Sequence, residues 1–379
     1  MNARDRLNAA LNHREPDRVP IDLGGIATTL TTGASAALEE RVGFCPDAGL
    51  MDRVLQAVVP GEALLERLHV DTRYAHLSAP AGWADIELDD DTYEDAFGIR
   101  RKAAYGPDGR LWYYDFVGHP LAGAESAADL ARFRWPDPRD PSRYAGLEAR
   151  VRDLYETTGY GVIANVCASV FEFAWYLRGF VQFFEDLVLD PAFAAALLDA
   201  VLDYQMALMD ETLKRVGPYV SVVMTGSDIG AQAGPLLSPD LYCRIVWPRD
   251  RALWDFIHSR TEAKIWHHTD GGVVPLIPHL IDGGVDALHP VQPLAAGMGD
   301  RQQLKRAFGD RLTFWGGFDQ QHVLPFGTPD EVRDAARRLL DDFMPGGGFV
   351  FAAGHNIQHD VPADNILTLF DTVYEYGRY

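Results

Sequence analysis

Two polar clusters in the last third of the chain hold side chains that could bind one metal ion. His268 and Asp270 end the run KIWHHTD at 264–270, and His355 follows the apolar run at 349–354. Residues two apart at the end of a strand point to the same side, so His268 and Asp270 can face one point. Two imidazoles and one carboxylate form a known ligand set for zinc or non-haem iron that leaves positions open for substrate. On spacing alone, hydrogen-bonded pocket residues without an ion are the favoured interpretation, and a metal site is the alternative.

Other polar residues at the ends of apolar runs could take part in catalysis around such a site. The candidates for moving a proton or orienting the substrate are Asp228, Asp319 and His289. A carboxylate or an imidazole at these positions can act as a general acid or base. Structural alternatives stand beside these roles. Asp319 could equally cap the following helix, Asp228 has the same ambiguity, and His289 fits pocket lining better than ligation.

Four further side chains are candidates for binding the substrate: Gln292, Gln320, Asn356 and Glu172. Asn356 follows His355 directly and could instead orient that ring from behind. Glu172 lies at the start of a predicted helix, where a glutamate commonly complements the helix dipole. The glycine pairs at 271–272 and 316–317 would leave room for a ligand to approach the backbone.

Four short apolar runs, separated by helix-like segments, carry most of these residues. The runs are KIWHHTD at 264–270, VDALHPVQ at 285–292, LTFWGGFDQ at 312–320 and FVFAAGHN at 349–356. The alternation begins near residue 160, with strands predicted at 161–166 and 219–224 and helices at 171–189, 191–216 and 238–260. Apolar strand, polar end and helix in repetition are typical of an α/β fold of the (β/α)8 TIM barrel type, whose chemistry lies at the strand ends.

The segments before residue 160 predict an N-terminal extension and a small β-rich insertion. Residues 3–13 have a helical pattern, and two prolines lead from it into a short strand at 19–23. Residues 26–80 are expected to be mostly helical or loop-like. Residues 82–121 hold short strand patterns around a Gly-Pro-Asp-Gly turn, which favours an insertion or lid. We therefore expect one barrel domain over residues 1–379.

Composition narrows the classes of partner and the compartment. The 55 acidic and 34 basic residues give a formal charge of −21, which argues against nucleic-acid binding. Uninterrupted apolar runs stay well short of eighteen residues, so we expect no membrane span, and the first twenty residues lack the apolar region of a signal peptide. Three widely spaced cysteines, at 45, 167 and 243, indicate a reducing compartment. These features predict a cytoplasmic protein.

Several longer segments resemble the uroporphyrinogen decarboxylase superfamily. They are RDRLNAALNHREPDRVPIDLGG, FEFAWYLRGFVQFFEDLVLDP, TGSDIGAQAGPLLSPDLYCRIVWP, HPVQP, FGDRLTFWGGFDQQHVLPFGTPDEV and GHNIQHDVPADNI. The resemblance spans nearly the whole chain and implies a (β/α)8 barrel. The superfamily includes the porphyrinogen decarboxylase itself and zinc methyltransferases that move methyl groups between corrinoid proteins, thiols and O-methyl compounds.

The methyltransferase branch matches better than the decarboxylase branch. The decarboxylase carries an early arginine-rich motif for its carboxylate-rich substrate, whereas this chain reads VPIDLGGIATT there. The thiol-methylating enzymes bind zinc through His-x-Cys and a later Cys, and the matching positions here are His268, Asp270 and His355. Replacing two thiolates by a carboxylate and an imidazole makes a harder site, with zinc expected first and another divalent ion second.

The resemblance implies a metal-dependent methyltransferase that moves a methyl group between a small methylated compound, with an oxygen-centred one favoured, and a corrinoid. The corrinoid would arrive on a separate protein, because the chain has no Asp-x-His-x-x-Gly motif. A decarboxylase or other lyase acting on a small carboxylic acid is the first alternative. A non-catalytic small-molecule-binding barrel is the second.

Overall fold

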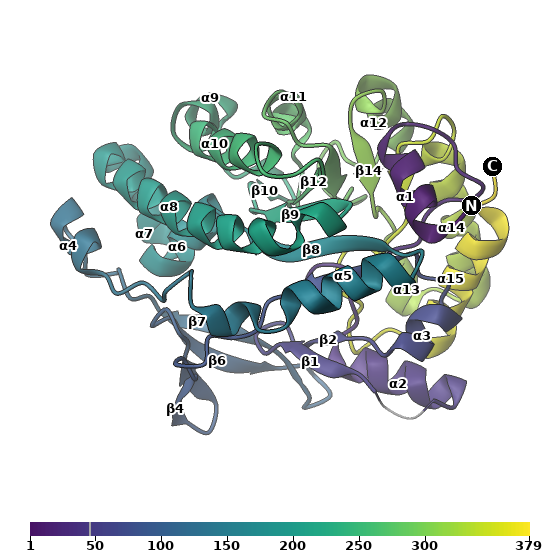
Figure 1. Ribbon diagram of the computed structural model, residues 1–379, viewed down its shortest axis with the longest axis horizontal. Helices are drawn as coiled ribbons and strands as arrows, with labels where there is room; N and C mark the ends of the chain where they lie inside the picture. Colours follow the sequence, from purple (N-terminus) through teal and green to yellow (C-terminus); the bar gives the residue numbers. More distant parts are fainter. Residues whose placement is uncertain (45–46) are drawn as a thin grey trace.

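A computed structural model describes residues 1–44 and 47–379, and its centre is a curved sheet of seven parallel strands. Along the sheet the strands follow the order β15, β14, β13, β12, β9, β8 and β3. Their bounds are β3 (Thr72–His76), β8 (Gly161–Ala168), β9 (Val222–Gly226), β12 (Lys264–His268), β13 (Ala287–His289), β14 (Thr313–Trp315) and β15 (Phe349–Val350). Figure 1 shows helices on the outside of this sheet.

The segment at residues 19–23 joins the two edges of the sheet and completes the barrel. The backbone nitrogen of Phe351, beyond β15, donates to the carbonyl of Pro20 at 2.9 Å, and that of Asp71, before β3, donates to Ile21 at 2.8 Å. Sequence patterning predicts a strand here, and the structure has an extended segment with single ladder contacts, parallel at Ile21. The predicted (β/α)8 fold is confirmed.

Alternating side chains of the strands separate an inner core from an outer one. On β12, Trp266 points into the barrel, whereas Ile265 points outward into the layer between strands and helices. Helix α1 (Ala3–Leu11) closes the barrel at the N-terminal ends of the strands, where its apolar residues join the inner core. The opposite end, where the strands finish, remains available for a site.

The helices of the barrel cover its outer face. Their bounds are α5 (Leu147–Thr157), α6 (Phe171–Arg178), α7 (Phe180–Leu189), α8 (Pro191–Val216), α9 (Pro239–Leu241), α10 (Trp247–His258), α11 (Ile277–Asp282), α12 (Arg301–Phe308), α13 (Val323–Phe326), α14 (Pro329–Phe343) and α15 (Ala363–Tyr376). The single helix predicted at 171–189 is two helices, because Gly179 between them has a φ of 98° that continues neither helix. The strand predicted at 219–224 begins three residues later.

Helix α8 is long and apolar enough to meet the length and composition of a membrane span. The most apolar eighteen residues within Pro191–Tyr219 have a mean hydropathy of 1.4, and half of them are buried within the molecule. Its buried side chains recur every three or four residues and pack against α7 and α10. This packing accounts for its apolar character as a helix of the barrel's outer layer.

Residues 82–121 form a separate antiparallel sheet, in the region where sequence patterning predicts a β-rich insertion. Its strands are β4 (Ile86–Asp89), β5 (Thr92–Glu94), β6 (Arg100–Tyr105) and β7 (Leu111–Gly118), paired in chain order. Figure 1 shows this sheet projecting to one side, beside the hairpin of β1 (Gly49–Asp52) and β2 (Ala57–Val59). We call residues 82–121 the insertion sheet.

The expectation that residues 26–80 are mostly helical or loop-like is wrong in part. Helices α2 (Thr32–Val42) and α3 (Glu62–Arg67) are present, but so are β1, β2 and the barrel strand β3. The sequence of β3, TRYAH, has no long apolar run and so is not recognised as a barrel strand. Its Arg73 is buried because it pairs with Glu62 and lies over the ring of Tyr160. A buried ion pair of this kind is invisible to hydrophobic patterning.

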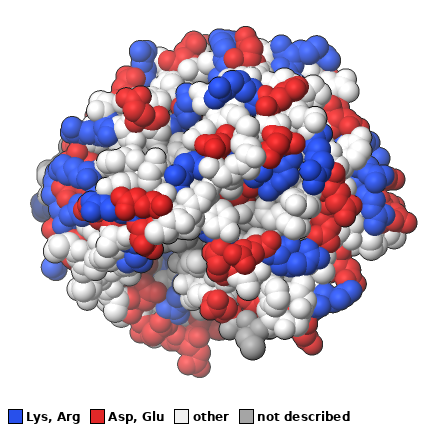
Figure 2. Space-filling view, turned by 45° about the vertical axis from the view of Figure 1, so that its right-hand side comes forward, with Lys and Arg blue, Asp and Glu red and all other residues white. Residues whose placement is uncertain are grey.

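Figure 2 shows Lys and Arg interspersed with Asp and Glu on the face in view. Helix α4 (Ala127–Arg132) follows the insertion sheet. Figure 1 shows the two termini close together, and Arg18 and Arg378 form an antiparallel contact. Cys167 and Cys243 are free thiols, while Cys45 lies outside the described residues.

Candidate metal centre and substrate cavity

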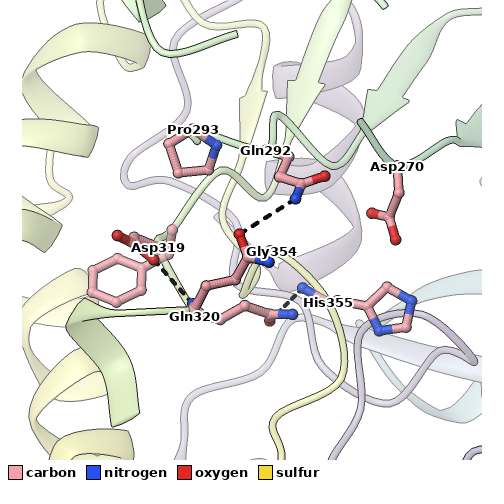
Figure 3. Close-up of a pocket in the computed structure, with 9 residues that line it drawn as sticks. Asp270, Gln292, Pro293, Asp319, Gln320, Gly354 and His355 are labelled. Atoms are coloured by element: carbon pink, nitrogen blue, oxygen red, sulfur yellow. Dashed lines mark hydrogen bonds between the residues drawn. The ribbon is translucent and has the colours of Figure 1, made fainter. Parts of the chain in front are cut away.

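His268, Asp270 and His355 come together at the C-terminal end of the barrel. His268 is the last residue of β12, Asp270 follows two residues later, and His355 lies in the loop after β15. One potential ligand atom from each residue lies within 4.8 Å of the other two. Figure 3 shows the Asp270 carboxylate and the His355 ring on the same side of a pocket, away from Asp319. The spacing of three donors suits a single ion.

The ring of His268 is held in one orientation by His289 at the end of β13. The two Nδ1 atoms are 2.9 Å apart, and His268 and His289 are both buried. Burial lowers the pKa of His289 well below its usual value, and the charges of His268 and His355 add to this effect. A neutral His289 can accept a hydrogen bond from the Nδ1–H of His268, which leaves the Nε2 lone pair of His268 for an ion. His289 therefore positions His268.

Asp270 is held through its backbone. Its N–H donates to Oδ1 of Asp228 at 2.8 Å, and the N–H of Gly271 donates to Oε1 of Gln292 at 2.8 Å. The same Asp228 oxygen lies 3.9 Å from Nε2 of His268. Asp228 and Gln292 thus stabilise the loop that presents Asp270 and leave the Asp270 carboxylate free of protein hydrogen bonds among the described residues.

The glycines near these residues have a different function from the one predicted. A Cβ on Gly271 would lie 2.4 Å from the backbone of residues 230–231, and a Cβ on Gly316 would lie 3.0 Å from the ring of His289. Both glycines also have positive φ. They allow segments of the protein itself to pack closely, so the prediction that they leave room for a ligand is wrong.

His355 is positioned by residues on both sides of its loop. Its backbone N–H donates to Oε1 of Gln320. The next residue, Asn356, accepts from the N–H of Thr29 at 2.8 Å and donates to the carbonyl of Ile26 at 2.7 Å. Because both ends of the buried Asn356 amide bind backbone groups, Asn356 ties the His355 loop to the N-terminal segment and does not face a ligand.

Two cavities meet at the three candidate ligands. The larger has a volume of about 440 Å³ and is lined by His268, His355, barrel residues and the insertion sheet. The smaller, about 150 Å³ and drawn in Figure 3, is lined by Asp270, His355 and the predicted residues Gln292, Asp319 and Gln320. His355 lines both. A volume of hundreds of cubic ångströms suits a small-molecule ligand, so the larger cavity is the candidate substrate site.

Glu172 and Asp228 form an acidic pair in the larger cavity. Burial raises the pKa of Glu172 to about 8, and the charge of Asp228 contributes to the shift. The hydroxyl of Tyr176 donates to Oε1 of Glu172 at 2.5 Å, and the N–H of Asp228 donates to Oε2 at 3.4 Å. Burial also raises the pKa of Asp228. The raised pKa favours the protonated form of Glu172 relative to an exposed glutamate, beyond any contribution to the dipole of α6.

Asp319 accepts hydrogen bonds from the backbone just before α13, which agrees with the alternative that it caps the following helix. Its Oδ1 accepts from the backbone N–H groups of Gln321 at 2.9 Å and His322 at 3.0 Å. These bonds fix the turn that leads into α13. Asp319 also lines the smaller cavity, so it is placed to contact a ligand there, but on the opposite side from Asp270 (Figure 3).

Sequence patterning missed the residues that the insertion sheet contributes. Arg101 and Phe116 line the larger cavity from β6 and β7, together with Tyr176 from α6 and Cys167 from β8. Arg101 stands in the run RRKAAY, which resembles an exposed basic strand. Burial of one arginine in such a run depends on how the sheet packs on the barrel, and the sequence carries no signal for that.

Comparison with known proteins assigns the family. Residues 121–376 match the family model for uroporphyrinogen decarboxylase (URO-D), and the chain belongs to this family. A uroporphyrinogen decarboxylase of Pseudoalteromonas translucida is 27% identical over 177 residues, 45% of this chain and 48% of that protein. One of Actinobacillus succinogenes is 23% identical over 265 residues, 67% and 70% of the two chains.

The length of these matches limits what they transfer. The chain spans about half the length of the Pseudoalteromonas protein. A uroporphyrinogen decarboxylase of Neisseria meningitidis is 29% identical over 121 residues, which are 31% of this chain and 34% of that protein. Among solved structures, a methyltransferase from Methanosarcina mazei superposes with a TM-score of 0.65 at 17% identity, covering 99% of both chains. That similarity establishes a shared fold along the whole chain.

Proposed function

We propose that this protein is a metal-dependent methyltransferase that moves a methyl group between a small methylated compound and a corrinoid carried by a separate protein. The observation that carries the proposal is the meeting of His268, Asp270 and His355 within 4.8 Å beside a cavity of about 440 Å³. The proposal includes a cytoplasmic location, because reduced corrinoids and the free thiols of Cys167 and Cys243 both suit a reducing compartment.

The donor set fits a divalent ion. Two imidazoles and a carboxylate suit zinc first, and another divalent ion second, with a position left for substrate. The ring of His268 has His289 behind it, as metal-bound histidines usually have such a partner, while Asp228 and Gln320 hold the backbones of Asp270 and His355. When bound, such an ion supplies Lewis acidity that polarises the heteroatom of the methylated substrate.

The protein's own residues have distinct tasks in this proposal. His289 accepts a hydrogen bond from the Nδ1–H of His268 and so directs the Nε2 lone pair of that ring toward the ion. Asp228 holds the Asp270 loop and orients the substrate. Glu172, whose raised pKa favours the protonated form, lines the larger cavity and is the group that donates a proton to the oxygen that loses its methyl group. In this scheme the methyl group leaves as the corrinoid accepts it, and the oxygen gains the Glu172 proton.

A decarboxylase that acts on a small carboxylic acid is the second candidate. The similar proteins named uroporphyrinogen decarboxylase favour it, and a protonated Glu172 could also protonate a carbanion. A substrate with many carboxylates is disfavoured, because the residues lining the larger cavity include one arginine, Arg101, beside four acidic residues. These four are Asp52, Asp115, Glu172 and Asp228.

The proposal is tested by loading the purified full chain with zinc and measuring methyl transfer from a panel of methoxy compounds to cob(I)alamin. We expect loss of the cob(I)alamin absorption with at least one compound, dependent on His268 and His355. Release of CO₂ from a small acid with no methyl transfer would instead support the decarboxylase. Binding without either reaction, together with metal content unchanged in H268A and H355A, would identify a binding protein.

A further inference from the structure

Arg101 on β6 is a buried cation whose hydrogen-bonding capacity is mostly unused. Only 6% of the residue is exposed. Its Nε donates to Oδ2 of Asp95 at 3.2 Å, and its guanidinium carbon lies 4.5 Å from the centre of the Phe116 ring. Among residues 1–44 and 47–379, its two terminal nitrogens make no hydrogen bond to protein. The guanidinium is thus held at one edge and on one face.

The free nitrogens of Arg101 border the cavity that holds the candidate metal ligands. Arg101 lines the same 440 Å³ space as His268, His355 and Glu172. Its terminal nitrogens are not sealed inside the protein, so a ligand carboxylate in the cavity can pair with them through charge-assisted hydrogen bonds. The two terminal nitrogens form a planar fork that matches the two oxygens of a carboxylate.

The acidic residues of the cavity restrict how many anionic groups a ligand can have. Within the described part of the chain, Asp95 is the acidic partner within 4.0 Å of Arg101. Asp52 lies beyond that distance; burial raises its pKa, and the charge of Arg101 opposes that rise. Asp52, Asp228 and Glu172 line the remaining wall, where a second carboxylate would meet like charge or a buried acid. The cavity therefore favours a ligand with a single carboxylate.

Aromatic rings lie next to the guanidinium. The rings of Phe116 and Tyr176 have centres 4.7 Å apart, and Arg101 lies within 5.9 Å of the Tyr176 ring. Flat apolar surfaces beside a cation suit the body of a small organic acid, because burial of its carbon atoms adds to the ion pair.

We propose that Arg101 is the substrate anchor of this cavity and binds the carboxylate of a small methylated monocarboxylic acid. The assignment of the methyl group rests on the proposed function, whereas the carboxylate contact does not. The inserted sheet thereby supplies a counter-charge that the N-terminal segment of the chain lacks, since that segment contributes Ile26 and Ala27 to the cavity.

The test is calorimetric binding of benzoate and its neutral analogue benzamide to metal-free full-length protein. Removing metal excludes binding of benzoate to an ion at His268, Asp270 and His355. We expect benzoate to bind at least about tenfold more tightly than benzamide, as charge-assisted hydrogen bonds imply. R101Q should remove that preference and leave benzamide affinity unchanged, and R101K should retain part of it because the charge remains without the fork.

The neighbouring Arg100 offers a matched control. Its side chain is 59% exposed and pairs with Glu94 at 3.0 Å, and it does not line the cavity. R100Q should bind benzoate like the unmodified protein. Equal affinity for benzoate and benzamide, or unchanged benzoate binding in a folded R101Q, would overturn the proposal. If R101Q does not fold, two measurements test the proposal: the ratio of benzoate to benzamide affinity in the unmodified protein, and the benzoate affinity of R101K.

This experiment separates the anchor from the reaction. Benzoate binding that depends on Arg101, with no methyl transfer to cob(I)alamin, would support the anchor and count against the methyltransferase. Methyl transfer together with benzoate binding that does not depend on Arg101 would support the methyltransferase and count against the anchor.

Discussion

The barrel end and the insertion sheet both form walls of the larger cavity and differ in how their polar groups are supported. At the barrel end, hydrogen bonds hold the ring of His268 and the backbones of Asp270 and His355. Arg101 on the insertion sheet has one edge paired with Asp95 and its other donors free. The supported wall suits a fixed reaction centre, and the open donors of the other wall suit recognition of a ligand.

This contrast implies that the two walls can change separately. The barrel end is built from strand termini locked by the parallel sheet, so a substitution there disturbs several contacts together. The insertion sheet is a continuous stretch of chain with its own pairing. Substrate choice can therefore vary on that sheet while the reaction centre stays the same.

The largest effect is expected from removing a ligand at the barrel end. In H268A or H355A, zinc affinity should fall by more than the roughly 10–100-fold that loss of an outer partner causes, and methyl transfer should disappear. Elemental analysis after dialysis measures the first and cob(I)alamin absorption the second. H322A, with a side chain 70% exposed, is the control and should retain zinc. Full zinc content in H268A would show that the reaction centre lies elsewhere.

A smaller effect is expected from the residue behind His268. In H289F, zinc affinity should fall roughly 10–100-fold, because Nδ1 of His268 loses its partner and the ring can turn. Zinc titration against a chelator measures the change. H267F is the matched control: His267 adjoins His268 on β12 but packs against Trp254 outside the barrel, so it should alter stability without altering zinc affinity. Equal zinc affinity in H289F and the unmodified protein would contradict this positioning role.

Glu172 lies between Tyr176 and Asp228 in the larger cavity, and its raised pKa makes the stability of the protein depend on pH. Its pKa of about 8 in the folded state exceeds its ordinary value of 4.5. Between these pH values the folded state retains a proton that the unfolded state has lost, so stability should fall as pH rises through this window and level off above about 8. E172Q cannot ionise, so its melting temperature should fall less between pH 5 and pH 9. Identical falls in calorimetry would show that Glu172 ionises normally.

The smallest effect on the site is expected at Asp319. Because Oδ1 of Asp319 accepts two backbone N–H groups of a turn, D319A should lower the free energy of unfolding by about 1 kcal/mol. Zinc affinity should stay unchanged, in contrast to D270A. Chemical denaturation and zinc titration of the two variants provide the comparison. Loss of zinc from D319A would extend the reaction centre into the smaller cavity.

The sequence by itself determined the barrel and the residues at its strand ends. Runs such as KIWHHTD and FVFAAGHN combine an apolar strand with a polar end, and both signals are local. Because parallel strands all end at the same edge, local patterns sufficed to predict that His268, Asp270 and His355 would come together. The helix at 191–216 was equally readable, since its side chains repeat every three or four residues.

Only the tertiary structure decided what surrounds those residues. In the folded protein His289 hydrogen-bonds His268, Gly271 and Gly316 allow segments to pack closely, and Arg101 is buried beside Phe116. Each of these depends on contacts between segments far apart in the chain, such as β6 with the barrel end or β12 with β13. A single position in the sequence states a side chain's chemistry, but burial, partner and direction arise only when distant segments pack together.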